Sequence, residues 1–263
     1  MITSYHCHTQ FSDGDCSIED HVREGIALGL DELGISDHYI LYPNRTIEWS
    51  MPVDGLPEYI SALQAVREMA GHQLTLRFGL EADYIPESAE RLGATLGIYP
   101  FDYVIGSIHF VGDFPIDESA IYWDDLSQGQ RNEIIRKYWH LTADMARSGL
   151  FDIVGHTDLY KKFGHRASVD ISEDIAEALD AVADAGMAVE LNTSGIRYAK
   201  EAYPAADILA QCYARGIPML VTADAHTPAN LTRYYDAGIR QLKSLGYTQQ
   251  ATFNGRELIL ADF

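Results

Sequence analysis

A strand-like apolar run followed by a helix-length segment recurs along the chain, and this alternation restricts the possible folds more than any other feature. The strand-like runs are Ile2–His6, Glu32–Asp37, Leu74–Asp83, Tyr103–Phe110, Asp152–His156, Met187–Thr193 and Met219–His226. The helix-length segments are Ser17–Leu28, Leu56–Gly71, Glu87–Leu96, Ser127–Ser148, Ser172–Ala185, Tyr203–Arg215 and Ala229–Leu245. Repeated βα units of this kind predict an α/β fold with parallel strands and crossover helices.

Closure of these strands into a barrel is favoured over an open sheet. The chain has no G-x-G-x-x-G and no P-loop motif, which would mark the nucleotide site of an open α/β sheet. Its 263 residues are enough for one large domain or two small ones. In a barrel of parallel strands, functional residues gather at the carboxyl ends of the strands.

The composition is that of an ordinary soluble globular protein, with 47 % hydrophobic and 22 % charged residues. No apolar run approaches the roughly 18 residues of a membrane span, and the N-terminus lacks the pattern of a signal peptide. The three cysteines (Cys7, Cys16 and Cys212) form no C-x-x-C pair, and their odd number argues against a disulfide framework. We therefore expect a protein of the reducing cytoplasm that has no membrane partner.

The formal net charge of −20 limits the possible partners. A nucleic acid is disfavoured, because phosphate backbones are bound by basic faces. A small anionic substrate remains compatible with this charge, since bound divalent cations would offset it where a phosphate lands.

Six of the ten histidines lie at or just after the ends of the predicted strands: His6, His8, His38, His109, His156 and His226. Three carboxylates occupy similar positions, namely Asp13 after His8, Glu81 in G-L-E-A-D-Y, and Asp224 two residues before His226. The other four histidines (His21, His72, His140 and His165) lie in predicted helices or loops and are expected at the surface.

Each of these residues, taken alone, also has a structural explanation. A histidine at a strand end is often only hydrogen-bonded, and H-x-H spacing in a strand puts two side chains on one face for any reason. A barrel, however, would gather all nine side chains in one pocket, where they would repel and desolvate one another without cations. Imidazole and carboxylate ligands suit zinc, iron or manganese, and nine ligands predict two or three such ions.

The order of these motifs resembles a known family. H-x-H-T near the start, then S-D-H, G-L-E, G-S-I-H-F, G-H-x-D and D-A-H, closely resemble the PHP (polymerase and histidinol phosphatase) superfamily over nearly the whole chain. Three longer stretches resemble its histidinol-phosphatase branch: G-S-I-H-F followed by P-I-D, G-L-F-D-I-V-G-H-T-D-L-Y-K-K-F-G, and E-L-N-T-S-G-I-R. The resemblance implies one distorted (β/α)7 TIM-like barrel domain over residues 1–263, with a trinuclear metal centre.

The resemblance also implies how the ligands are shared. The first ion takes His6, His8, Glu81 and Asp224; the second shares Glu81 and adds His109 and His156; the third takes Asp13, His38 and His226. Asp15 competes with Asp13 for its position, because the ligand at this point of the family varies between histidine and aspartate and the two aspartates are close together.

Such a centre predicts hydrolysis of a phosphate monoester, because a hydroxide bridging two divalent ions is a nucleophile near neutral pH. The phosphate-binding positions of the family match Arg197 and either Lys161 or Lys162, and Ser194 adds a hydrogen-bond donor. Asp15 is a candidate general acid, with a simple turn residue as the alternative. Asp113, Asp117 or Glu118 are candidates for binding a substrate ammonium.

One position departs from the family pattern. Some histidinol phosphatases carry a second histidine two residues after the S-D-H histidine, where this chain has Ile40. The leading hypothesis is nevertheless an L-histidinol phosphate phosphatase of histidine biosynthesis. The alternatives are a PHP hydrolase of another small phosphate ester or nucleotide, and a non-catalytic metal-binding module.

Overall fold

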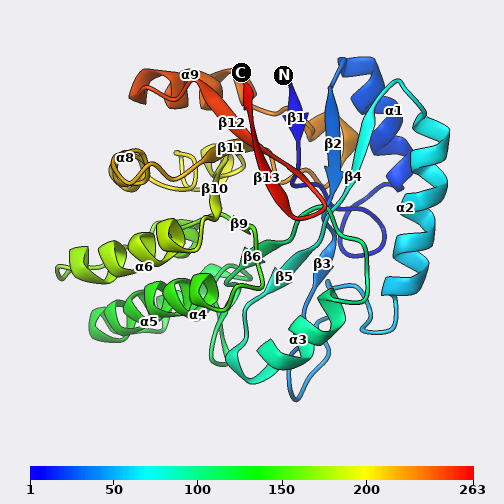
Figure 1. The fold of residues 1–263 in the computed structure, drawn as a ribbon. Helices are drawn as coiled ribbons and strands as arrows, with labels where there is room; N and C mark the ends of the chain where they lie inside the picture. Colours follow the sequence, from blue (N-terminus) through cyan, green and yellow to red (C-terminus); the bar gives the residue numbers. More distant parts are fainter.

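Short parallel strands form the centre of the molecule in a computed structural model that describes residues 1–263 (Figure 1). The strands of this centre are β1 (Thr3–Ser4), β2 (Glu32–Ile35), β3 (His38–Tyr39), β4 (Thr75–Phe78), β5 (Glu81–Asp83), β6 (Ile105–Ser107), β9 (Ile153–Val154), β10 (Ala188–Asn192) and β11 (Met219–Thr222). All of them except β3 lie within the seven predicted runs, and β4 and β5 share the run Leu74–Asp83. β3 follows directly after the predicted run Glu32–Asp37 and was not predicted as a strand.

The strands follow one another in a ring. One sheet has the order β1-β2-β4, and the other has the order β3-β5-β6-β9-β10-β11, every neighbouring pair being parallel. A parallel bridge between Cys7 and Ala225 joins the continuation of β1 to that of β11. There the Ala225 N–H donates to the His6 carbonyl (3.0 Å), and the His8 N–H donates to the Ala225 carbonyl (2.9 Å). The expected α/β fold with a parallel, barrel-like arrangement is confirmed.

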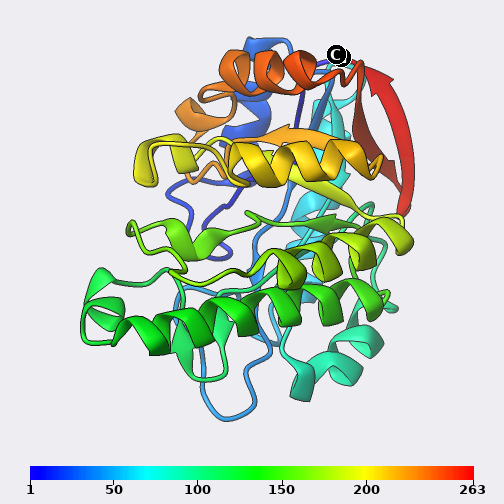
Figure 2. The same ribbon diagram turned by 90° about the vertical axis from the view of Figure 1, so that its left-hand side faces the viewer.

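Helices cover the outside of the strands (Figures 1 and 2). They are α1 (Ile18–Leu28), α2 (Leu56–Ala70), α3 (Ala89–Leu96), α5 (Gln128–Arg147), α6 (Ser172–Asp184), α8 (Ala206–Ala214) and α9 (Tyr235–Leu245). Two of them begin with capping boxes, in which Ser17 pairs with Asp20 and Ser127 with Gln130, so that free N–H groups of the first turn are satisfied.

Several short elements were not predicted. They are the hairpin of β7 (Phe110–Val111) and β8 (Phe114–Pro115), the helices α4 (Ala120–Asp124) and α7 (Gly195–Tyr198), and the 3₁₀ turns η1 (Pro86–Ser88), η2 (Leu159–Lys161) and η3 (Pro228–Asn230). The last helix was expected from Ala229 but begins only at Tyr235. The preceding Tyr234 has a left-handed backbone (φ 60°) that interrupts the helix.

The end of the barrel where the strands start is closed by an antiparallel hairpin, β12 (Gln249–Asn254) and β13 (Glu257–Asp262). Phe253 of β12 is buried beside Tyr5 and Tyr103, with ring centroids 6.2 Å from each. The carboxyl ends of the strands, at the opposite mouth, are therefore left free for a site. None of the helices combines the length and the apolar character needed to cross a bilayer.

Candidate metal centre

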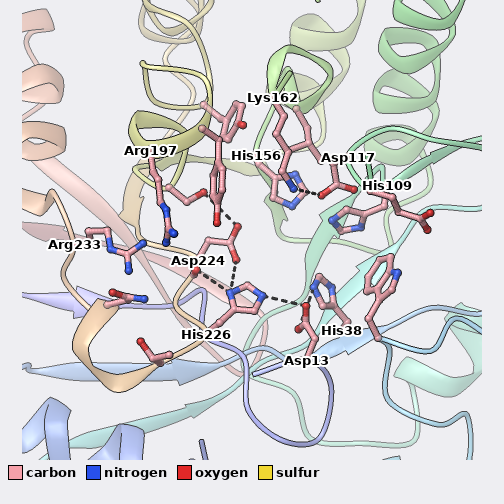
Figure 3. A pocket seen from close by; sticks show the side chains of 18 of the residues that line it. Asp13, His38, His109, Asp117, His156, Lys162, Arg197, Asp224, His226 and Arg233 are labelled. Carbon is pink, nitrogen blue, oxygen red and sulfur yellow. Dashed lines mark hydrogen bonds and ion pairs between the residues drawn. The ribbon is translucent and has the colours of Figure 1, made fainter. Parts of the chain in front are cut away.

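The nine predicted ligands meet at the mouth formed by the carboxyl ends of the strands. Figure 3 labels those that face the cavity, namely Asp13, His38, His109, His156, Asp224 and His226. Four groups of them have ligand atoms within 4.8 Å of one another. The groups are His8, Asp13, His38 and His226; His6, His8 and Glu81; His6, His156 and Asp224; and His38, Glu81 and His109. Residues that are far apart in the sequence are thus brought to one place by the ring of strands.

Glu81, the first residue of β5, lies at the centre of this cluster and is fully buried. Its Oε2 lies 2.8 Å from His38 Nδ1 and 3.1 Å from His6 Nε2, and its Oε1 lies 2.9 Å from His156 Nε2. Burial by itself would raise the pKa of Glu81, but the imidazoles, His38 and His6 above all, hold it well below its usual value. Glu81 is therefore an ionised carboxylate that faces several nitrogen ligands.

A second part of the cluster lies nearer to solvent. Asp13 Oδ2 is 3.2 Å from His226 Nε2, and Asp13 Oδ1 is 3.7 Å from His38 Nε2. His8 stacks between His38 and His226, with ring centroids 4.2 and 4.4 Å away. Burial and these two neighbouring imidazoles lower the pKa of His8 to about 3. His8 is therefore neutral, which is the form that binds a metal.

Several buried ligand atoms have no hydrogen-bond partner, which tests whether the residues fit a cation. They are His6 Nε2, both ring nitrogens of His8, and His38 Nδ1 and Glu81 Oε2, which lie 2.8 Å apart without forming a hydrogen bond. Buried polar atoms without partners cost free energy. A cluster of such imidazole nitrogens around an ionised carboxylate is therefore best satisfied by cations that bind to them. The donor set of imidazole nitrogens and carboxylate oxygens suits divalent transition metals.

Two further buried carboxylates, which the sequence analysis missed, hold the histidines in place. Glu190 in β10 accepts from His6 Nδ1 (2.8 Å), and Asp83 in β5 lies 2.6 Å from His109 Nδ1. Burial alone would lower the pKa of His109, but Asp83 raises it to about 10. A carboxylate on the far nitrogen of a ligating histidine fixes the orientation of the ring. An acidic residue inside the apolar strand A-V-E-L-N was the signal that could have identified Glu190.

A cavity of about 530 Å³ opens over the cluster. Its walls include four of the residues that were predicted to handle substrate: Asp15, Lys162, Ser194 and Arg197. Trp49, Tyr198, Tyr203 and Arg233 also line it and were not predicted. Trp49 packs edge-on against His38 and His109, with ring centroids 4.7 and 5.3 Å away, so it covers one side of the cluster.

Lys161, which was expected to bind substrate, does not line the cavity. Its side chain is fully buried, and its Nζ lies 2.9 Å from the Asp158 carboxylate and donates to the Ala202 carbonyl (2.7 Å). It does not reach the cavity, because its position on η2 directs the ammonium towards the protein interior. The neighbouring Lys162 does line the cavity, where Asp117 Oδ2 lies 2.9 Å from its Nζ.

The other acidic candidates are separated by the fold. Asp117 and Glu118 line the cavity, whereas Asp113 faces elsewhere and accepts from the Tyr42 hydroxyl at 2.9 Å. In the first loop both Asp13 and Asp15 line the cavity. The Asp13 carboxylate reaches the histidines, whereas the Asp15 backbone N–H donates to the His226 carbonyl (2.9 Å).

His21 was expected at the surface but is fully buried, with Nε2 2.9 Å from the His8 carbonyl. It shares the buried face of α1 with Ile18, Val22 and Gly25, a helical spacing that was visible in the sequence. His72 and His140 are exposed, and His165 is half-buried against Trp123.

Residues 4–194, which supply seven of the nine clustered ligands, match the PHP domain family. The chain belongs to this family. This PHP protein is 35 % identical over 241 residues to a probable histidinol-phosphatase of Deinococcus radiodurans, an alignment that covers 91 % of each chain. It is 26 % identical over 257 residues to a histidinol-phosphatase of Bacillus subtilis, with 88 % of this chain and 96 % of that one covered.

A solved structure shares the fold of this PHP protein over nearly its whole length. It is the histidinol phosphate phosphatase of Lactococcus lactis, with a TM-score of 0.80, 24 % sequence identity and coverage of 98 % of each chain. That crystal structure contains zinc, L-histidinol and phosphate. The expected family and fold are thereby confirmed.

Proposed function

We propose that this protein is a metal-dependent phosphomonoesterase that hydrolyses L-histidinol phosphate to L-histidinol and phosphate, a step of histidine biosynthesis. The observation that carries the proposal is the convergence of six imidazoles and three carboxylates on one mouth of the barrel, under a cavity that also holds arginines. The names of the relatives from Deinococcus and Bacillus support the choice of substrate. The three cysteines, all buried and free, support a cytoplasmic location.

The proposed cofactors are two to three divalent transition metals, zinc, iron or manganese. We assign His6, His8, Glu81 and Asp224 to the first ion, Glu81, His109 and His156 to the second, and Asp13, His38 and His226 to the third. The close group of His6, His8 and Glu81 supports the first assignment, and the group of Asp13, His38 and His226, which also includes His8, supports the third. The second has weaker support, because Glu81 Oε1 lies 2.9 Å from His156 but 3.7 Å from His109.

Bound ions of this kind lower the pKa of water and offset charge on phosphoryl oxygens. The chain's own residues position the ester. Arg197 offers a planar fork of N–H donors to two phosphoryl oxygens, and Lys162 adds a donor at the cavity wall. The Ser194 hydroxyl donates to the Asn192 side-chain oxygen (2.7 Å), so it would have to turn from this partner to bind the phosphoryl group. We assign no such role to Lys161, whose ammonium is already bound by Asp158 and Ala202.

Proton transfer to the leaving oxygen is assigned to Asp15. Both aspartates of the first loop line the cavity, but Asp13 lies within 3.7 Å of His226 and His38, whereas Asp15 has no ion pair. The substrate ammonium is assigned to the acidic wall of Asp117 and Glu118. Since Asp117 also binds Lys162, Glu118 is the carboxylate that is free to pair with a new cation.

A panel of phosphate esters tests the proposal. Phosphate release is measured from L-histidinol phosphate, nucleotides and an aryl phosphate, with the metal content of the same sample determined by elemental analysis. The proposal expects L-histidinol phosphate to be the best substrate and two to three metal equivalents per chain. If another ester is hydrolysed better, the proposed substrate is wrong, but the proposed reaction class, phosphate monoester hydrolysis, still stands. One equivalent or none in fully active protein would overturn the multinuclear centre.

A further inference from the structure

Two arginines line the cavity without a carboxylate partner. Of the three basic side chains in its wall, Lys162 is paired with Asp117 at 2.9 Å. The guanidinium groups of Arg197 and Arg233 make no ion pair, although the chain has 39 acidic and only 19 basic residues. Figure 3 shows the two side chains next to each other beside Asp224. Two like charges held together in this way favour an anion between them.

The backbone of Arg233 is fixed to the segment that carries Arg197. Thr193, which follows β10, has its hydroxyl 2.6 Å from the Arg233 carbonyl and 2.8 Å from the Thr222 carbonyl at the end of β11. The single proton of this hydroxyl therefore serves both carbonyls. Ser194 follows Thr193 directly, and Arg197 lies three residues further on in the short helix α7, so the turn that carries Arg233 and the segment that carries Arg197 are anchored at one point.

The turn before α9 presents a row of polar side chains to the cavity. Thr227, Asn230 and Arg233 are spaced by three residues and all line it. The spacing follows from consecutive turns of 3₁₀ type, in which the Asn230 N–H donates to the Thr227 carbonyl and the Arg233 N–H to the Asn230 carbonyl (both 3.0 Å), so that every third residue faces the same side. The left-handed Tyr234 then separates this turn from α9. A continuous helix from Ala229 would have followed a different periodicity.

We propose that Arg233 binds the phosphoryl group of the substrate together with Arg197, as the second guanidinium of a two-arginine site at the cavity edge. This inference rests on the proposed function. A monoester phosphate carries close to two negative charges and three terminal oxygens, which two forks of N–H donors match. The charge of Lys162 is already balanced by Asp117, so the two arginines supply the unbalanced positive charge.

The test is the affinity of the metal-loaded protein for inorganic phosphate, measured by titration calorimetry. We expect Arg233→Ala to weaken phosphate binding about tenfold or more, because a hydrogen-bonded charged contact is lost. Arg233→Lys keeps the positive charge but not the fork of N–H donors, so its phosphate affinity should lie between those of the wild-type protein and Arg233→Ala. The matched control is Arg240→Ala on the exposed side of α9, which should bind phosphate as the wild-type protein does.

Each outcome has a defined meaning, provided that metal content is equal in all variants. Unchanged phosphate affinity in Arg233→Ala overturns the inference. A raised KM with unchanged phosphate affinity also overturns it, because Arg233 would then contact the leaving group. The proposed substrate is judged separately, from phosphate release by the wild-type protein. Weaker phosphate binding in Arg233→Ala supports the two-arginine site even if another ester proves to be the better substrate.

Discussion

At the scale of single residues, Glu190 shows how a buried charge is held in this protein. Four donors surround its fully buried carboxylate: His6 Nδ1, the His156 N–H, the Asn192 side-chain amide and the Thr222 hydroxyl. Burial would raise its pKa, but the charge of His6 keeps it lowered. The carboxylate thereby links histidines that follow two different strands, and only an acceptor of four hydrogen bonds satisfies this position.

The first prediction concerns this carboxylate. Glu190→Gln keeps the shape but puts an NH₂ group against donors, so His6 and His156 lose their fixed orientation. We expect metal affinity to fall about 10- to 100-fold, measured by competition with a chromophoric chelator. Glu173→Gln, exposed in the first turn of α6, is the control and should bind metal normally. Unchanged affinity in Glu190→Gln would show that Glu190 does not orient the ligands.

Gly34 gives the second prediction. Tyr103 is fully buried inside the barrel, and a Cβ at Gly34 or Gly79 would overlap its phenol ring. Gly34→Ala should therefore lower the free energy of unfolding by about 1–3 kcal/mol, measured by urea denaturation. In the control Gly129→Ala, the new methyl group on α5 meets open space, so the variant should be as stable as the wild-type protein or slightly more. Equal stability of Gly34→Ala and wild type would disprove the overlap.

At the scale of elements, the hairpin of β12 and β13 packs at the end of the barrel opposite to the candidate metal centre, so it contributes to stability without contacting the site. Phe253 and Ala251 of β12 belong to a buried cluster with Tyr5, Tyr103 and residues at the starts of the strands. On β13, by contrast, Ile259 and Leu260 are about half exposed, at 45 % and 49 %. The hairpin therefore closes the end of the barrel opposite to the candidate ligands mainly through β12, while Leu258 is the residue of β13 that packs partly buried against the same cluster.

The third prediction follows from this position. Phe253→Ala should cost about 3–5 kcal/mol of stability, because it leaves a cavity beside Tyr5 and Tyr103. Its metal content should remain that of the wild-type protein, because the ligands lie at the other mouth. Leu260→Ala, on the exposed strand of the same hairpin, should change stability little. Thermal unfolding and elemental analysis of both variants measure these effects. Loss of metal from folded Phe253→Ala would contradict the separation of the two ends.

The regular elements were predictable from the sequence because apolar runs and helix caps are local signals. The runs Leu74–Asp83 and Met187–Thr193 contain β4, β5 and β10, and Ser127 marks the start of α5. The start of α9 was not predicted, since it follows the left-handed Tyr234 and the turn that Thr193 anchors. The anchoring hydrogen bond joins Thr193 to Arg233, which lie 40 positions apart in the sequence, so no local sequence pattern could indicate it.

The same distinction holds for the candidate site. The clustering of His6, His8 and the other candidate ligands was predictable from their positions at strand ends, because parallel strands bring their carboxyl ends together. The sequence could not separate Lys161 from Lys162, since the direction of each side chain depends on how η2 packs against Asp158 and Ala202. Arg233 was not predicted as a site residue, because it was expected within the helix from Ala229, whereas it lies in the turn before α9.

At the scale of the whole molecule, the candidate centre connects seven of the nine strands of the ring, all but β2 and β4. The ligands come from the ends of β1, β6, β9 and β11 and from β3 and β5, while β10 contributes Glu190, which holds His6. Bound cations would therefore stabilise the ring as a unit. They would also offset part of the net charge of −20, which opposes the compact state.

The last prediction is that removing metal destabilises the whole barrel. A ligand that binds only the folded state stabilises it by about 2.7 kcal/mol at 100 times its Kd, which corresponds to a Tm shift of roughly 5–10 °C for a chain of this size. Chelation should lower the Tm by such an amount, and added metal should restore it. In the control Asp13→Asn, which weakens a proposed ligand, the shift should be smaller. An identical Tm with and without metal, when elemental analysis confirms its removal, would show that the cluster does not tie the strands together.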